Sequence, residues 1–199
     1  MNRRQALILA AGALAGLPAA AAKPAPQFEV LDTSLRKRSL SEFRGKTVVL
    51  EWTSATCPYV QAQYESGVMP ELQRWSAAQG IAWLSIISTH PSRRGYLQPD
   101  KAEAMQRARG GAPAALLMDA AGNVGRAYGA VVTPHMFVID PKGELVYSGA
   151  ISDNPTMSAR EARASRNYVK AALDDLAAGR KIATPSTRPF GCTIAYSGD

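Results

Sequence analysis

The pattern that decides the fold lies in residues 39–60, SLSEFRGKTVVLEWTSATCPYV. A serine cap and Gly45 bound one short helical turn at its start. Residues 47–52 are apolar and β-branched, which is typical of a central strand. Cys57 follows after a short turn, and Pro58 stands at the first helical position, where its missing N–H costs nothing. The stretch therefore predicts a buried strand that leads through a cysteine into a helix.

Strands and helices alternate along the rest of the chain. Hydrophobic periodicity and turn residues predict the following elements: a short strand at 28–31, a helix at 58–78 interrupted near Gly67, a strand at 81–88, a helix at 100–110, a strand at 114–118, a hairpin of 136–139 with 145–148, and a last helix at 159–178. This order predicts an α/β fold with parallel central strands and an antiparallel edge.

The N-terminus is typical of a secretory signal peptide. Arg3 and Arg4 supply the positive start, and residues 6–17 form an apolar run that is too short to span a bilayer. Small residues precede a cleavage point after Ala22. We therefore expect a periplasmic or secreted protein that has no membrane association once the peptide is removed. An uncleaved anchor or a buried first helix is the alternative.

Composition excludes several classes of protein. Removal of Arg3 and Arg4 lowers the formal net charge from +7 to +5, and the remaining basic residues are scattered, with no signature of nucleic-acid binding. The mature chain has two cysteines, Cys57 and Cys192, which is too few for a disulfide framework. They also lack zinc-ligand spacing, so we expect no metal site and no nucleic-acid partner.

Three stretches carry a resemblance to a known family. Residues 39–60 resemble the entry to the active site of the thioredoxin-like redoxins. In AYGAVVTPHMFVID, residues 127–140, Thr133 and Pro134 resemble the threonine–cis-proline pair that faces the active cysteine. GCTIAY, residues 191–196, is similar to the C-terminal end of peroxiredoxin-like redoxins related to the alkyl hydroperoxide reductase/thiol-specific antioxidant group.

The resemblance implies a thioredoxin-like fold, a central mixed β-sheet flanked by helices. Together with the N-terminal pattern, it divides the chain into a signal peptide at 1–22, a redoxin domain at 23–181 and a tail at 182–199 that carries Cys192. It also implies a thiol oxidoreductase that needs no cofactor.

The motif departs from both parent groups. Dithiol thioredoxins have two cysteines three residues apart, and Ser54 stands where the first would be. A peroxiredoxin has Thr or Ser three residues before its cysteine, which Ser54 satisfies, and Pro seven residues before, where this chain has Leu50. Some relatives have a cysteine just before the Thr-Pro pair, where Val132 stands here. The motif is therefore intermediate and nearer to the peroxiredoxins.

Cys57 is the candidate nucleophile. Backbone N–H groups and the positive end of the helix dipole stabilise a thiolate at a helix start. Attack on a peroxide O–O bond would give a sulfenic acid, with Ser54 bonded to the peroxide oxygen or to the thiolate. A buried, inert thiol is the alternative for Cys57.

Cys192 is the candidate resolving cysteine. It would condense with the sulfenic acid to form a Cys57–Cys192 disulfide, which an external thiol reductant must reopen. The alternative is a permanent structural bridge between the same residues, worth roughly 4–5 kcal/mol because it closes a loop of more than about a hundred residues.

The remaining candidates would shape the substrate site. Thr133 and Pro134 would form the wall opposite Cys57. The residues expected to touch substrate are Pro58, Trp52, His135 and Arg126. For these last three, the alternatives are a core tryptophan, a histidine that faces solvent or caps the strand, and a solvated arginine.

Three functions follow from these residues. The first is an exported thiol-dependent oxidoreductase that is peroxiredoxin-like and reduces peroxides. The second is thiol–disulfide exchange with exported proteins. The third is a non-catalytic redoxin scaffold with a structural disulfide, which would present a peptide- or metal-binding surface. The expected partners are a peroxide or a protein disulfide as substrate, and an external thiol as reductant.

Overall fold

A mixed β-sheet forms the centre of the molecule. The computed structural model describes residues 23–198, so the predicted signal peptide lies outside the described residues. The six strands, in spatial order, are β1 (Lys23–Pro24), β9 (Glu144–Gly149), β8 (His135–Ile139), β4 (Val48–Trp52), β5 (Ala82–Ile87) and β6 (Ala115–Met118). β4, β5 and β6 are parallel to one another. β8 runs antiparallel to β4, and β9, which is antiparallel to β8, runs in the direction of β4. The predicted α/β fold, parallel centre and terminal hairpin are confirmed.

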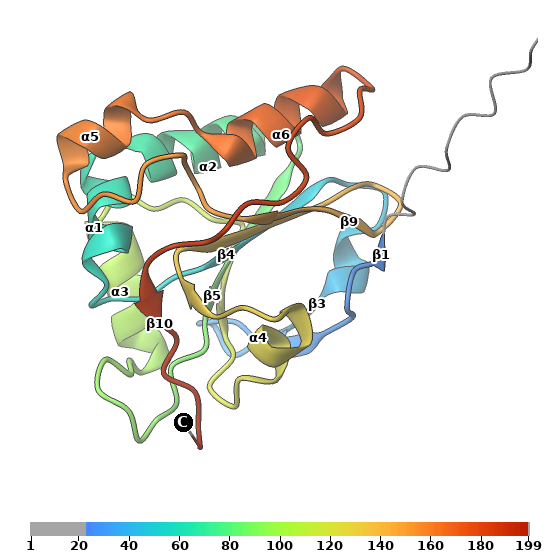
Figure 1. The fold of residues 1–199 in the computed structure, drawn as a ribbon. Coiled ribbons are helices and arrows are strands. Elements are labelled where there is room, and N and C mark those ends of the chain that lie inside the picture. The colour runs from blue at the N-terminus through green and yellow to red at the C-terminus, as the bar shows by residue number, and fades with distance from the viewer. Residues whose placement is uncertain (1–22, 199) are drawn as a thin grey trace, which may run out of the picture.

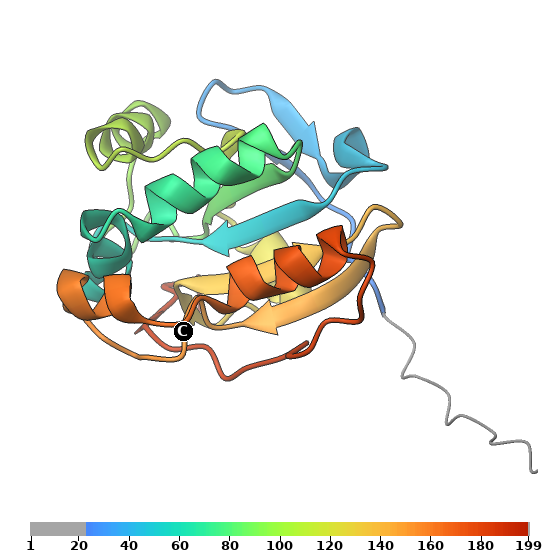
Figure 2. The same ribbon diagram turned by 90° about the horizontal axis from the view of Figure 1, so that it is seen from above.

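Helices cover both faces of this sheet. One face carries α1 (Pro58–Glu65), α2 (Val68–Ala78), α3 (Pro99–Ala108), α5 (Ala159–Ala164) and α6 (Tyr168–Ala177). The other carries the 3₁₀ turn η1 (Leu40–Phe43) and α4 (Asn123–Tyr128), with the small hairpin β2 (Glu29–Leu31) and β3 (Lys37–Ser39) (Figure 1). Seen from above, α2 and α6 run side by side along the strands (Figure 2). Among residues 23–198, no helix has the length and apolar character that crossing a membrane requires.

Two hydrophobic cores result from the alternation of side chains along β4. Because successive residues of a strand point to opposite faces, Leu50 and Trp52 join one core and Val49 joins the other. The core that contains Val49 also contains Cys57. The active-site cysteine candidate thus lies on the face covered by α1, α2 and α6.

One of the helix breaks in the structure was predicted from the sequence, and another was not. The expected interruption near Gly67 is confirmed, since this residue has φ +80° and precedes α2. The prediction of a single last helix at 159–178 is wrong, because this range contains two helices, α5 and α6. The side chain of Asn167 accepts a hydrogen bond from the Lys170 N–H and starts α6 anew, so an N-cap in mid-segment divides the helix.

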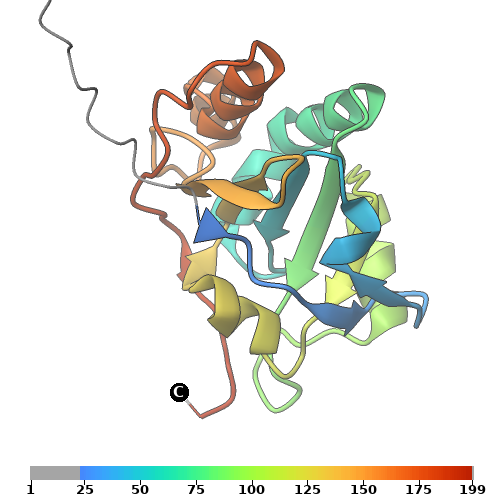
Figure 3. The same cartoon turned by 90° about the vertical axis from the view of Figure 1, so that its right-hand side faces the viewer.

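The C-terminal tail folds back along the sheet. It runs from α6 past β9 and includes strand β10 (Cys192–Thr193), which pairs antiparallel with β7 (Val132–Thr133) (Figures 1 and 3). The sequence pattern did not predict these two short strands. The pairing places Cys192 directly opposite Thr133.

A buried carboxyl group connects the helices to the sheet. Glu51, in the middle of β4, is 0% exposed. Its oxygens accept hydrogen bonds from Tyr64 Oη (2.9 Å), Gln73 Nε2 (3.0 Å), Trp83 Nε1 (2.8 Å) and Ser85 Oγ (2.8 Å). α1, α2, β4 and β5 therefore meet at one acceptor, which fixes the position of α1 relative to the strands.

Replacement of this acceptor should be costly. The Glu51→Ala variant removes the acceptor of the buried Tyr64, Trp83 and Ser85 donors, while Gln73 Nε2 keeps its bond to Tyr64 Oη. The free energy of unfolding should therefore fall by about 3–5 kcal/mol. Urea denaturation measures the change. Glu65→Ala, at the exposed end of α1, is the matched control and should change stability by less than about 0.5 kcal/mol. A loss below 1 kcal/mol in Glu51→Ala would show that the network contributes little.

Candidate active site

Cys57 lies between the start of a helix and the cis-proline loop. It is the N-cap residue of α1, and its side chain is buried, with 1% of the residue exposed. The thiol donates a hydrogen bond to the Thr133 carbonyl oxygen at 2.9 Å. The Thr133–Pro134 peptide bond is cis, as the resemblance to the redoxins implied. The candidate wall and the candidate nucleophile are thus in direct contact.

Cys192 is the second thiol of the site. Strand pairing sets it opposite Thr133, whose carbonyl already binds the Cys57 thiol. Cys192 packs against the hydrophobic cluster that contains Cys57, and the two thiols influence each other's protonation. Both residues are free thiols, and Cys192 is the more exposed of the two. Two cysteines that are distant in the sequence therefore meet at one carbonyl group.

The environment of Cys192 keeps it protonated. Burial raises the pKa of the Cys192 thiol to about 12, and the hydrogen bond to Cys57 and the charge of Cys57 act in the same direction. Cys192 is therefore a thiol, and not a thiolate, at neutral pH. In this arrangement it can donate a proton to the Cys57 sulfur.

The turn before Cys57 is held by an arginine that sequence reasoning missed. Arg109, the C-cap residue of α3, donates to Thr53 Oγ1 (3.0 Å) and to the Ser54 carbonyl (3.5 Å). Its guanidinium lies 3.7 Å from the centre of the Tyr64 ring, whose hydroxyl binds Glu51. Nothing in the local sequence distinguishes Arg109, because only tertiary packing brings α3 to this turn.

Ser54 and Pro58 lie on either side of the cysteine. The Ser54 hydroxyl accepts a hydrogen bond from the Thr56 N–H at 3.3 Å, so it is engaged within the turn. Pro58 is the first residue of α1 and is exposed beside Cys57. Cys57 is the N-cap of α1, and the residue three positions later is Val60, which is buried in the core and has no thiol. The second thiol of the site therefore comes from the tail and not from α1.

The predictions for Trp52 and His135 require correction. Trp52 is 0% exposed and packs against Tyr128 and Phe137 in the core on the other face of the sheet. His135 is 5% exposed, and its ring lies 4.4 Å from that of Phe137. Both side chains belong to the face opposite Cys57 because of strand alternation. The geometry therefore excludes them from contact with a substrate at the thiol.

Arg126 also has a different role from the one predicted. Its guanidinium donates to the carbonyls of Ala121 and Ser197, both at 2.8 Å, and lies 4.7 Å from the centre of the Tyr196 ring. These contacts attach the end of the tail to α4. The positive charge of Arg126 is used there, away from Cys57.

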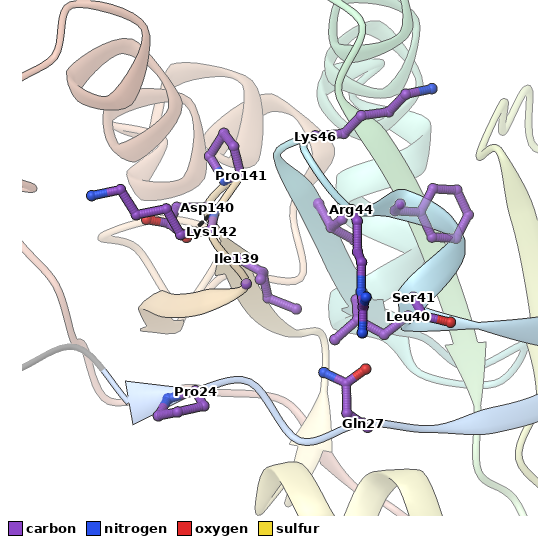
Figure 4. Close-up of a pocket in the computed structure, with 13 residues that line it drawn as sticks. Pro24, Gln27, Leu40, Ser41, Arg44, Lys46, Ile139, Asp140, Pro141 and Lys142 are labelled. Atoms are coloured by element: carbon purple, nitrogen blue, oxygen red, sulfur yellow. Dashed lines mark hydrogen bonds between the residues drawn. The ribbon is translucent and has the colours of Figure 1, made fainter.

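One cavity lies at the opposite end of the sheet. It has a volume of about 360 Å³ and includes Val48, at the start of β4, and Ile139, at the end of β8 (Figure 4). Its rim carries the basic residues Arg44, Lys46 and Lys142. It has no part in the thiol site. Within residues 23–198, no cluster of three or more His, Cys, Asp or Glu residues is placed to hold a metal ion.

The profile of the AhpC/TSA family matches residues 21–148, more than half of the chain. The chain belongs to the AhpC/TSA family. It is therefore a thiol oxidoreductase of the thioredoxin-like redoxins. A search of curated proteins gave no match.

Solved structures confirm the fold of this family member. A hypothetical protein from Sinorhizobium meliloti is 24% identical, with a TM-score of 0.75 over 92% of this chain and 98% of that one. An uncharacterized conserved protein from Geobacillus kaustophilus is 22% identical, with a TM-score of 0.76 over 89% and 93%. A secreted Mycobacterium tuberculosis disulfide oxidoreductase, homologous to E. coli DsbE, is 20% identical, with a TM-score of 0.51 over 69% and 92%.

Alkylation of Cys192 should depend on pH through its contact with Cys57. With a pKa of about 12, its reaction with iodoacetamide in the reduced protein should still rise at pH 11 without reaching a plateau. Cys57→Ala removes the hydrogen bond and the charge but not the burial, so the curve should shift to lower pH. Cys57→Ser, which retains an acceptor, should lie between. Identical curves in all three proteins, read by peptide mass spectrometry, would refute the contact.

Acid should destabilise the fold through His135. Burial lowers the pKa of His135 to about 4, from an ordinary value of 6.5. The folded state favours the neutral ring, whereas the unfolded state takes up a proton at the ordinary pKa. The free energy of unfolding is therefore unaffected by His135 above pH 6.5 and falls as the pH drops from 6.5 towards 4. The loss amounts to up to about 3 kcal/mol. Unfolding free energies measured from pH 7 to pH 4 should fall less steeply in His135→Leu. An unchanged slope would show that other groups dominate.

Proposed function

We propose that this AhpC/TSA-family chain is an exported two-cysteine peroxidase. Cys57 is the nucleophile, and Cys192 resolves its oxidised form. The observation that supports this most strongly is the contact between the two thiols at the Thr133 carbonyl. A resolving cysteine must reach the sulfur that it attacks, and here the fold holds the two together.

The first step oxidises Cys57. Its thiolate sulfur attacks the terminal, hydrogen-bearing oxygen of a hydroperoxide ROOH, and the O–O bond breaks. The sulfur becomes a sulfenic acid, and the leaving RO⁻ takes up a proton to give ROH. The N-cap position of Cys57 supports this step, because the helix dipole and the free N–H groups of α1 stabilise negative charge on the sulfur.

The second step forms the disulfide. The Cys192 sulfur attacks the Cys57 sulfenic sulfur, an S–S bond forms, and the hydroxyl leaves as water with the proton of the Cys192 thiol. An external dithiol then reduces the disulfide by two exchange steps and is itself oxidised. Ser54, Thr133, Pro134 and Pro58 surround the reacting sulfur in this scheme, and Arg109 holds the turn that presents it.

The place of action follows from the N-terminal pattern. We propose that residues 1–22 direct export and are removed near Ala22, and that the mature protein consists of the redoxin domain and the tail 182–199. The substrate and the reductant would then be encountered in the periplasm or outside the cell.

Thiol–disulfide exchange with exported proteins is the second candidate. It is favoured by the helix-start position of Cys57 opposite a cis-proline, and by the fold similarity to the secreted disulfide oxidoreductase described above. The low identity limits that similarity to the fold. Strand β10 counts against this candidate, because it already occupies the edge of β7 beside the thiol, where a substrate protein would have to bind.

Peroxide consumption by the reduced mature protein tests the proposal. With excess dithiothreitol, wild type should consume hydrogen peroxide catalytically, and Cys57→Ser should lose at least about a hundredfold in rate because the nucleophile is absent. Cys192→Ser should form a sulfenic acid on Cys57 that dimedone traps, with little intramolecular disulfide. Mass spectrometry follows each species.

Two other results would reject the peroxidase. No peroxide turnover with rapid reduction of a protein disulfide, lost in Cys57→Ser, would establish the exchange function. A Cys57–Cys192 bridge that forms once, resists dithiothreitol and supports no turnover would establish the non-catalytic scaffold.

A further inference from the structure

The tail covers the candidate nucleophile. We call residues 187–196 the strap. Within residues 23–198, β10 of the strap is the strand partner of β7, and the Phe190 ring lies 5.9 Å from that of Tyr59 on α1. Cys57 stands at a helix start, a position open to solvent in an uncovered helix, yet it is 1% exposed. A reactant must therefore pass the strap to reach the sulfur.

One glycine allows the strap to lie this close. Gly191 has φ +139°, and a Cβ built there would overlap the carbonyl group of Thr133 and lie 3.2 Å from Pro134 N. The Thr133 carbonyl is the same group that binds the Cys57 thiol. Any side chain at position 191 would thus push the strap away from the site without touching either sulfur.

The strap is attached at both ends. Upstream, Thr187 Oγ1 accepts a hydrogen bond from the Ala150 N–H at 2.8 Å and lies 2.7 Å from Tyr147 Oη. Downstream, Tyr196 Oη donates to the Ala130 carbonyl at 2.9 Å, and the His90 N–H donates to the Ala195 carbonyl at 2.9 Å.

The downstream anchor is also fitted into the core. A Cβ on Gly125 would overlap the Tyr196 ring, so the ring depends on that glycine for its space. Ile194 is buried in the same core. A segment that is fixed at both ends and carries a short strand between them opens by a small local separation, not by release of the tail.

We propose that the strap is a size filter for Cys57 and that Gly191 determines its specificity. The inference rests on the proposed function, since it names the substrate class of the same thiol: small hydroperoxides, such as hydrogen peroxide. Bulky organic hydroperoxides and protein disulfides are excluded, because they need the strap detached from an anchor.

Two alkylating reagents with one reactive group test the filter without peroxide. Iodoacetamide is the small probe and a fluorescein-linked iodoacetamide is the bulky one. At Cys57 of the reduced protein, the ratio of small-probe to bulky-probe rate should exceed the ratio measured for glutathione by about tenfold or more. In Gly191→Ala it should fall towards the glutathione value. Peptide mass spectrometry resolves Cys57 from Cys192.

The tail offers a matched control just beyond the strap. Gly198 also has positive φ (+85°), but no atom lies within 4 Å of a Cβ built there. Gly198→Ala should therefore retain the wild-type ratio. If Gly191→Ala does not fold, as judged by circular dichroism, Tyr196→Phe decides, because loss of the bond to Ala130 loosens the downstream anchor and should lower the ratio.

Other results would overturn the filter. A wild-type ratio equal to that of glutathione would show that the strap does not select by size. An unchanged ratio in folded Gly191→Ala would show that the close approach at Gly191 does not control access. If that variant does not fold, an unchanged ratio in Tyr196→Phe would show the same for the downstream anchor. Because alkylation needs no peroxide, failure here is distinct from failure of the peroxidase, which the turnover assay detects.

Discussion

The carbonyl oxygen of Thr133 is the atom on which the site depends. It accepts the Cys57 thiol at 2.9 Å, and its carbonyl group contacts the backbone at Gly191. Strand pairing also sets Cys192 opposite Thr133. One backbone group thus brings together α1, the cis-proline loop and the tail. The backbone position of Cys192 relative to Thr133 is set by strand pairing.

A second network holds the other side of the cysteine. Glu51 receives donors from α1, α2 and the strand beside it, and Arg109 connects Tyr64 of this network to the turn at Thr53 and Ser54. The turn before Cys57 therefore has little freedom to move independently of the sheet. Preorganisation of this kind suits a thiol whose partner must approach along one direction.

Burial and reactivity oppose each other at this site. Cys57 is covered by the strap, and its surroundings keep Cys192 protonated as a thiol. Both sulfurs are therefore unreactive while the strap is in place. The same cover keeps Cys192 in contact with Cys57 and gives an oxidised Cys57 a nearby sulfur. The glycine at 191 and the two anchors set the balance between access and protection.

Local sequence determined the α/β class, the strand–cysteine–helix order around Cys57 and the hairpin that follows Pro134. The resemblance to the redoxins implied the cis bond before Pro134. The locally determined features depend on residues close together in the chain: alternating apolar positions, Pro58 at a helix start, and Gly67 at a break. Even here Asn167, a helix cap inside an apolar pattern, divided a segment that periodicity alone read as one helix.

Only the tertiary structure decided the rest of the site. Trp52 and His135 are close to the site in sequence, yet strand alternation assigns them to the opposite core, and Arg126 is occupied by the tail. Arg109, Glu51 and Gly191 act through partners far away in the chain, whose proximity no local pattern encodes. The meeting of Cys57 and Cys192 has the same origin, because it depends on the return of the tail to the edge of β7.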